Sequence, residues 1–320
     1  MKKFDIEKEN KDIVLRYKAL LRACSSEITR EDKKLIRKAF NLAVEAHKDV
    51  RRKSGEPYIF HPIAVAQIVA KDIGLDATAI SCALLHDVVE DTKYSLDDMK
   101  RLFNPKVSQI INGLTKISGF GEQNSSAQAE NFRKMLLTIS DDVRVILIKL
   151  ADRLHNMQTL ESMPDQKQQK IASETLYIYA PLAHRLGLYS IKTELEDLGL
   201  KYTQPDMYRD IARQLNETKK ARIQYIQRFI KPLKDSLKIH DLNFSIKGRP
   251  KSIFSIRKKM KNQGISFNEV YDKFAIRIIL TSDLNGEKSD CWKTYSLITD
   301  HYHPNQDRLR DWISTPKANG

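Results

Sequence analysis

Residues 84–92 read LLHDVVEDT, so an apolar run includes one histidine and three carboxylates within six positions. Burying an unpaired charge is costly, and a helix that only fills a core would not carry these side chains. If the helix of ATAISCALLHDVVED continues through this stretch, His86, Asp87, Glu90 and Asp91 lie on one face over about one turn. Such a face requires a cation, and a divalent metal would compensate the carboxylates and accept a neutral imidazole nitrogen.

Two other segments can supply further ligands. Asp152 interrupts the apolar run VILIKLA and is followed one turn later by Asn156, and His61 stands at the mouth of a helix in IFHPI. Taken alone, His61 is typical of a capped loop, and Asp152 could simply pair with its neighbour Arg153. Together with LLHDVVEDT, however, they predict a mixed nitrogen and oxygen site that suits Mn²⁺ or Fe²⁺ better than a thiolate metal. The predicted metal ligands are His61, His86, Asp87 and Asp152.

The pattern along the 320 residues predicts a mainly α fold in two domains. Apolar residues recur at helical spacing, so residues 1–195 are expected to form an all-α domain and residues 196–240 connecting helices. In residues 241–320, NFSIKGRPKS and KFAIRIIL alternate with period two around a helical segment. This pattern indicates the opening of an α/β domain with too few strands to complete its sheet.

Composition restricts the compartment and the partners. No apolar stretch approaches the roughly 20 residues that cross a bilayer, and the N-terminus is polar, which favours a soluble protein without a membrane partner. Three widely spaced cysteines fit a reducing compartment, so we expect a cytoplasmic location. A net charge of +14 favours anionic partners, either nucleic acid or polyphosphate nucleotides, and charge alone does not choose between them.

A second group of residues lies around KGRPKSIFSIRKKMK, where basic side chains flank a strand-to-helix transition that could hold phosphates. Asp272 follows at the start of a strand, as an edge charge or as a Mg²⁺ ligand. A solvated basic helix face is the alternative interpretation of this stretch.

The order His61, His86-Asp87, Asp152 resembles the HD phosphohydrolase superfamily, which is all-α and metal-dependent. The longer stretches RRKSGEPYIFHPIAVA, LLHDVVEDT, VILIKLADRLHNMQTL and ETLYIYAPLAHRLGL resemble the RelA/SpoT family of bifunctional (p)ppGpp synthetase/hydrolases, from residue 35 onward. This resemblance implies Mn²⁺-dependent hydrolysis of the 3′-pyrophosphate of (p)ppGpp to GDP or GTP and pyrophosphate.

The resemblance also implies roles for individual residues. Glu90 and Asp91 would act on the attacking water beside the four metal ligands. The nucleotide pocket would include Arg52, Lys53, Ser54, Asn156 and Thr159. An arginine can stack on a purine and a lysine can neutralise phosphate, although RRKSGEP alone could be a solvated basic loop.

GRPKS and the D-x-x-A-x-R of Asp272 to Arg277 resemble the family's nucleotidyltransferase-like synthetase domain. The resemblance implies a Mg²⁺ ligand at Asp272 and ATP contacts from Arg249, Lys251, Ser255 and Lys259. The family's acceptor-stacking tyrosine and catalytic glutamate do not follow PKANG, so we expect an incomplete and inactive synthetase. Ribosome contacts are expected only through a C-terminal region that this sequence lacks, and no direct nucleic-acid contact is expected.

Three alternatives remain open. Another HD-type reaction on dNTPs or cyclic nucleotides would keep the metal and change the substrate. A non-enzymatic alarmone- or RNA-binding module would bind in a salt-dependent way without needing His86. A synthetase with a dead hydrolase domain would have lost metal ligands, whereas all four are present here.

Overall fold

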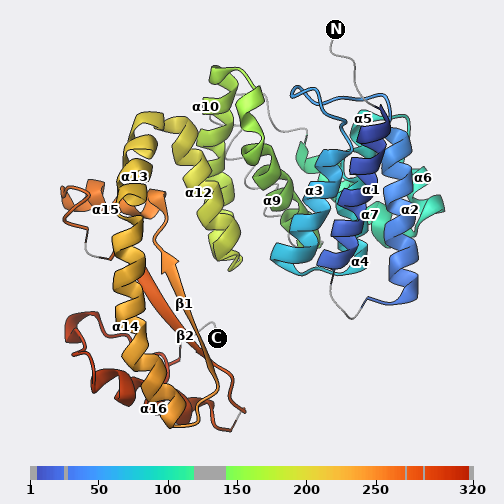
Figure 1. The fold of residues 1–320 in the computed structure, drawn as a ribbon. Coiled ribbons are helices and arrows are strands. Elements are labelled where there is room, and N and C mark those ends of the chain that lie inside the picture. The colour runs from blue at the N-terminus through green and yellow to red at the C-terminus, as the bar shows by residue number, and fades with distance from the viewer. Residues whose placement is uncertain (1–5, 25–27, 119–141, 271, 284, 317–320) are drawn as a thin grey trace. The chain divides into compact units, whose positions relative to one another are not determined.

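The computed structural model describes residues 6–24, 28–118, 142–270, 272–283 and 285–316, apart from the side chains of residues 221, 222, 249 and 250. The chain divides into two compact units, Met1–Gln204 and Pro205–Gly320 (Figure 1). The mainly α fold class predicted from the sequence is confirmed. The domain boundaries drawn at residues 195 and 240 stay predictions.

The regular elements described in the first unit are all helices. They are α1 (Ile6–Ala23), α2 (Arg30–Ala46), α3 (Phe60–Ile68), η1 (Val69–Ile73), α4 (Ala77–Leu85), α5 (Val88–Asp91), α6 (Leu96–Leu102), α7 (Pro105–Ser118), α9 (Val143–Gln158), η2 (Leu160–Ser162), α10 (Asp165–Glu174), η3 (Thr175–Tyr179), α11 (Ala180–Arg185) and α12 (Tyr189–Thr203).

Local sequence signals fix several helix ends. Ser95 and Asp98 form a capping box at the start of α6, in which each side chain bonds to the other residue's backbone N–H. Gly74 ends η1 with φ 79°, a left-handed conformation that glycine adopts without a Cβ penalty. Both signals depend on residue types close together in the sequence and not on the tertiary fold.

The helix expected to run through LLHDVVEDT is instead interrupted at His86 and Asp87. α4 ends at Leu85, and α5 begins at Val88. The His86 Nδ1 atom lies 2.8 Å from the carbonyl oxygen of Ala83, which in a continuous helix would accept from the amide of Asp87. The histidine and the aspartate therefore lie at a junction between two helices and not along one helical face.

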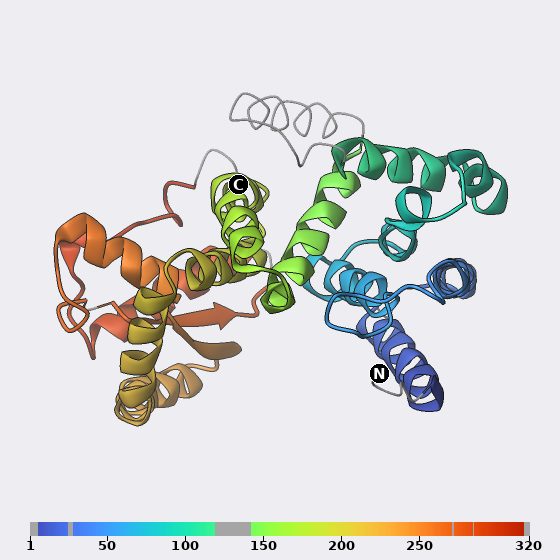
Figure 2. The same cartoon turned by 90° about the horizontal axis from the view of Figure 1, so that it is seen from above.

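One hydrophobic core holds the first unit together and surrounds this junction. Leu84, Leu85 and Val88, which flank His86 and Asp87, are fully buried. α9, green in Figure 2, packs against α3, α4, α7 and α12, and its Ile148 and Leu150 are fully buried. The charged residues of α9 are thus held on a helix with little freedom to shift.

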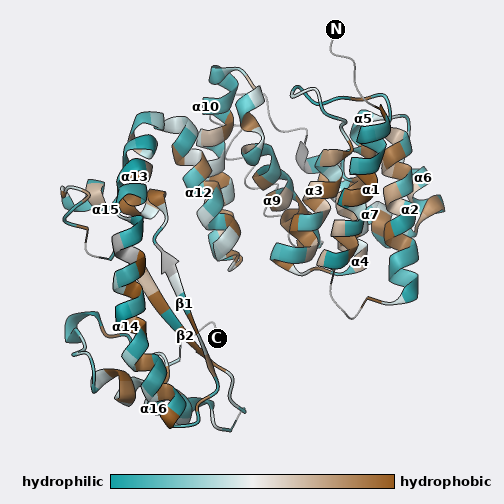
Figure 3. Ribbon diagram, viewed as in Figure 1, coloured by the Kyte–Doolittle hydropathy of each residue, from teal (hydrophilic) through white to brown (hydrophobic). Residues whose placement is uncertain are grey.

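In its described residues, the second unit has a small sheet and four helices longer than one or two turns. The elements are α13 (Pro205–Glu217), α14 (Lys219–Ile239), β1 (Phe244–Pro250), α15 (Ile253–Gln263), β2 (Phe274–Leu280), α16 (Glu287–Thr299) and η4 (Gln306–Arg308). β1 and β2 pair antiparallel, with Ile246 opposite Ile278, and they form the whole sheet in the described residues. The core cluster of the second unit is small and consists of Ile211, Ile256, Phe267 and Val270. Much of α14 is coloured as hydrophilic in Figure 3.

Candidate metal centre and nucleotide pocket

Four side chains from three parts of the first unit converge on one point. His61 comes from the first turn of α3, His86 and Asp87 from the junction of α4 and α5, and Asp152 from the middle of α9. His61 Nε2 lies 3.2 Å from Asp152 Oδ1 and 3.6 Å from Asp87 Oδ2. His86 Nε2 lies 3.0 Å from Asp87 Oδ2 and 3.8 Å from Asp152 Oδ1. Two imidazole nitrogens and two carboxylate oxygens therefore face one another.

The chemistry of His86 fits a metal ligand. His86 is completely buried, and a carbonyl oxygen only accepts hydrogen bonds, so Nδ1 donates its proton to Ala83. In the neutral ring this leaves a lone pair on Nε2, and that atom makes no hydrogen bond although Asp87 is close. A buried lone pair directed at carboxylates is unfavourable, so Nε2 requires either a proton or a bound cation at this point.

The electrostatics of the cluster favour a cation at the same point. Burial raises the pKa of Asp87 and of Asp152, but neighbouring histidines, His86 for Asp87 and His61 for Asp152, lower both below their ordinary values. Burial opposes the charged form of His86, yet the two carboxylates raise its pKa to about 10, so without a metal Nε2 carries a proton that a bound ion would replace. Both carboxylates are therefore ionised and attract positive charge. Of the His, Cys, Asp and Glu residues that the structure describes, His61, His86 and Asp152 bring their ligand atoms within 4.8 Å of one another.

Polar side chains hold the two carboxylates in place. The Tyr58 hydroxyl donates to Asp87 Oδ2 at 2.6 Å and lies 3.3 Å from Asp91 Oδ2. Burial, reinforced by Asp87, raises the pKa of Tyr58, which keeps the hydroxyl protonated. Asn156 donates from Nδ2 to Asp152 Oδ1 at 2.7 Å. Asp91 is thus linked to the cluster through Tyr58, and both Asp91 and Glu90, its neighbour on α5, are exposed.

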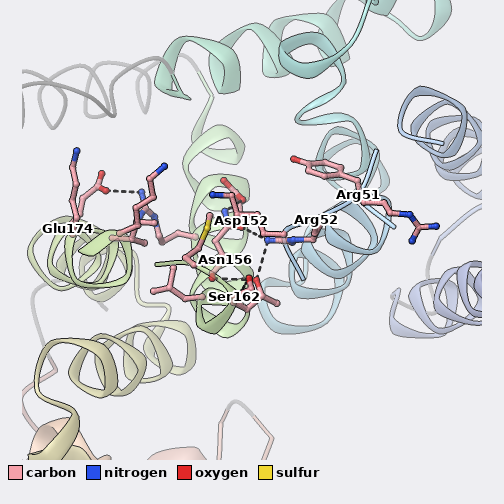
Figure 4. A pocket seen from close by; sticks show the side chains of 15 residues that line it. Arg51, Arg52, Asp152, Asn156, Ser162 and Glu174 are labelled. Carbon is pink, nitrogen blue, oxygen red and sulfur yellow. Dashed lines mark hydrogen bonds and ion pairs between the residues drawn. The ribbon is translucent and has the colours of Figure 1, made fainter. Parts of the chain in front are cut away.

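A pocket of about 570 Å³ opens beside the cluster, and Asp152 is part of its wall. Arg52 crosses the pocket wall and donates to Asn156 Oδ1 at 3.1 Å and to Thr159 Oγ1 at 3.2 Å (Figure 4). Arg51 also borders the pocket, but its guanidinium points away from it in Figure 4 and pairs with Glu9 at 2.8 Å. The basic side chains that line the pocket are Arg51, Arg52, Lys53, Arg153, Lys167 and Lys170. Such a lining suits a ligand with several phosphates.

Four of the five residues predicted to bind the nucleotide line this cavity. They are Arg52, Lys53, Asn156 and Thr159, whereas Ser54, on the same turn as Lys53, is not among the lining residues.

Two further residues that contact the site were not singled out from the sequence. Tyr58 precedes His61 by three positions in EPYIFHP, and His155 follows Asp152 by three positions on α9. Their spacing was visible, but their contacts depend on the tertiary fold.

His155 connects the pocket to the metal cluster. Its Nδ1 atom lies 2.8 Å from His61 Nδ1 and 3.3 Å from Arg52 Nη1. Burial, together with the nearby His61 and Arg52, lowers the pKa of His155 to about 3. His155 is therefore neutral over the physiological range.

The second unit brings together part of the other predicted group. Asp272 Oδ2 accepts from Lys251 at 2.7 Å, and Asp272 Oδ1 accepts from Lys259. Burial raises the pKa of Asp272, but the two lysines outweigh it and lower the value to about 2. Ser255 accepts a 2.8 Å hydrogen bond from Ser252, the N-cap of α15. Arg249 lies on β1, and its side chain is outside the described part of the structure.

No helix in the described ranges has the length and apolarity needed to cross a membrane.

Comparisons with known proteins agree with these two groups of residues. A family model described as "HD domain" matches residues 39–189, and one described as "Region found in RelA / SpoT proteins" matches residues 248–320. Among solved structures, one described as a metazoan ortholog of SpoT matches over 51% of this chain and 99% of its own, with 23% identity and a TM-score of 0.38.

Three curated relatives are similar over nearly the whole chain. A probable guanosine-3′,5′-bis(diphosphate) 3′-pyrophosphohydrolase of Synechocystis is 43% identical over 89% of this chain and 37% of the relative. A GTP pyrophosphokinase of Myxococcus xanthus is 41% identical over 90% of this chain and 38% of the relative. The bifunctional (p)ppGpp synthase/hydrolase SpoT of Escherichia coli is 41% identical over 90% of this chain and 40% of the relative. The chain thus spans about two fifths of the length of these relatives, and the resemblance found in its sequence motifs is confirmed.

Proposed function

The chain belongs to the RelA/SpoT family, and from this premise we propose that its first unit is a Mn²⁺-dependent (p)ppGpp hydrolase. The reaction removes the 3′-pyrophosphate of guanosine tetra- or pentaphosphate and releases GDP or GTP. The observation that carries the proposal is the position of Asp152, which belongs both to the cluster of metal ligands and to the wall of the basic pocket. A polyphosphate nucleotide in the pocket can therefore bring one phosphate to the cluster.

We assign the ion to His61, His86, Asp87 and Asp152. The donor set of two imidazoles and two carboxylates supports a borderline divalent ion such as Mn²⁺. When bound, the ion polarises a phosphoryl oxygen and lowers the pKa of water at the site. Tyr58 and Asn156 keep the two carboxylates oriented by donating to them.

The remaining residues act on water and on the nucleotide. We assign Asp91, aligned by Tyr58, and its neighbour Glu90 to accept a proton from the attacking water. The new bond forms between this water oxygen and the phosphorus at the 3′ position, and the bond from that phosphorus to the 3′-oxygen breaks. The 3′-oxygen leaves with a proton, and pyrophosphate is released.

Arg52, Lys53, Asn156 and Thr159 would bind the nucleotide. The hydrogen bonds of Arg52 to Asn156 and Thr159 fix the plane of its guanidinium, whose face can stack on guanine. Lys53 contributes positive charge to the phosphates from the same loop. We assign Ser54, on the same turn, to the nucleotide as well.

The second unit would bind a nucleoside triphosphate. We assign Lys251, Lys259, Ser255 and Arg249 to ATP and Asp272 to Mg²⁺, in accordance with the RelA/SpoT region matched there. The three cysteines, Cys24, Cys82 and Cys291, are free thiols, which supports a cytoplasmic location.

The test of the hydrolase is release of pyrophosphate from 3′-labelled guanosine tetraphosphate by the purified chain. We expect activity with Mn²⁺, none with EDTA, and none in a variant carrying His86→Ala and Asp87→Ala. His184→Ala, which removes an exposed histidine on α11, is the matched control and should retain activity. If a folded, Mn²⁺-binding chain leaves this substrate intact and instead hydrolyses a dNTP or a cyclic nucleotide, the proposed substrate is wrong.

A further inference from the structure

His155 holds a position that the reaction above does not use. It lies on α9, one turn after Asp152, and its ring is 4.9 Å from the ring of His61 between centroids. Two nitrogen atoms approach its Nδ1 atom: His61 Nδ1 at 2.8 Å and Arg52 Nη1 at 3.3 Å. One imidazole nitrogen is thus shared between a metal ligand and a residue of the pocket wall.

The chemistry of these contacts fixes where the protons lie. A guanidinium nitrogen can only donate, so His155 Nδ1 accepts from Arg52. A neutral imidazole carries one proton, which in His155 must then be on Nε2. His61 Nδ1 faces the same nitrogen at the shorter distance of 2.8 Å, so we assign it as the main donor to the single lone pair of His155 Nδ1, with Arg52 as the weaker, shared donor at 3.3 Å.

A proton on Nδ1 of His61 determines the state of the other ring nitrogen, Nε2. With its proton on Nδ1, neutral His61 has a lone pair on Nε2, the atom directed at Asp152 and Asp87. This is the form in which an imidazole binds a metal. His86 has the same arrangement once an ion replaces the proton on its Nε2, because its Nδ1 donates to the backbone of Ala83.

We propose that His155 is a positioning residue that fixes the tautomer and ring orientation of His61 for metal binding, and that Arg52 orients His155 from the nucleotide pocket. The proposal rests on the assignment of His61 as a ligand in the proposed function. Ligating histidines generally donate their second N–H to a fixed acceptor, and loss of that acceptor typically weakens metal binding 10–100-fold. Here the acceptor is a side chain, so it can be replaced by mutation.

The first experiment measures Mn²⁺ binding to the full chain by titration calorimetry. His155→Leu removes the acceptor and should weaken binding about 10–100-fold. His155→Asn can place its amide oxygen near the position of Nδ1 and should bind within a few-fold of the wild type. His184→Leu controls for the loss of a histidine elsewhere in the same unit. Equal affinity in His155→Leu and the wild type, or an equal loss in both His155 variants, would overturn the proposal.

The second experiment uses the protein loaded with Zn²⁺, a diamagnetic ion that suits the same nitrogen and oxygen donors. Long-range ¹H–¹⁵N NMR then reports which ring nitrogen of His61 carries a proton and which binds the ion. We expect a proton on Nδ1 and the ion on Nε2 in the wild type, and loss of this signature in His155→Leu. A proton on Nε2 of His61 in the loaded wild type would contradict the proposal. A wild type that binds neither Mn²⁺ nor Zn²⁺ would instead contradict the metal assignment of the proposed function, on which this proposal rests.

Discussion

Asp91 is the carboxylate that shares a hydrogen-bond donor with a predicted metal ligand, since Tyr58 lies between it and Asp87. We expect Asp91→Asn to lower kcat for (p)ppGpp hydrolysis by about 10²–10⁴, the range typical for loss of a general base. Mn²⁺ affinity should stay within a few-fold, because Asp91 is not assigned to the ion. Steady-state kinetics and calorimetry on the same preparation measure the two quantities. Asp97→Asn, at an exposed aspartate of α6, is the matched control. A parallel loss of metal affinity would instead make Asp91 a ligand.

At this scale the sequence predicted residue types better than it predicted their partners. The histidines and carboxylates of the cluster could be identified because charged groups in apolar helical surroundings require a cation. Tyr58 and His155 could not, because their roles depend on contacts with Asp87 and His61, 29 and 94 positions away in the sequence. Periodicity carries no information on such contacts.

At the scale of the element, α9 carries Asp152, His155 and Asn156, so its N-terminus matters to the site. Asp142 caps it by accepting from the amide of Arg144 at 3.0 Å, and it also pairs with the side chains of Arg144 and Lys106. We expect Asp142→Ala to lower the free energy of unfolding at pH 7 by about 1–2 kcal/mol, the upper range for a lost N-cap. Urea unfolding measures this, with Asp49→Ala at an exposed turn as the control.

The pH dependence of this effect follows from its cause. Hydrogen bonds from Arg144, followed by Lys106, lower the pKa of Asp142 below its ordinary 3.8. A carboxylate with a lowered pKa stabilises the fold above its ordinary pKa, and the contribution disappears as pH falls toward the folded value. The difference in unfolding free energy between wild type and Asp142→Ala should therefore decrease as the pH falls below about 4. A difference that is constant from pH 7 to pH 3 would show that the ion pairs contribute nothing.

Helix ends were predictable where a side chain caps its own helix, as Ser95 does for α6. The interruption between α4 and α5 was not, because it involves a ring nitrogen of His86 bonding to the backbone of Ala83. An apolar helical pattern continues across both residues and gives no sign of this bond. The error affects geometry more than identity: all four ionisable residues still lie within one short segment, but at a junction of helices.

For the molecule as a whole, the candidate metal-binding carboxylates of the two units have different partners: histidines in the first unit and lysines in the second. In the second unit both oxygens of Asp272 are already held by lysine ammonium groups, so Mg²⁺ would have to displace Lys251 and Lys259. The described sheet has two strands, and a sheet of that size is marginal as a platform for catalysis. We therefore predict that this chain does not transfer pyrophosphate from ATP to GDP.

The transfer assay needs a background in which product would survive. The variant with His86→Ala and Asp87→Ala removes hydrolysis, so any 3′-labelled product made from β,γ-labelled ATP and GDP would accumulate in the presence of Mg²⁺. We expect none above the level of a further variant with Asp272→Ala. Accumulation in the first variant that is lost in the second would show that Mg²⁺ displaces the lysines and that Asp272 works as a ligand. The arrangement of Asp272 between two lysines would then represent the resting state of an active site.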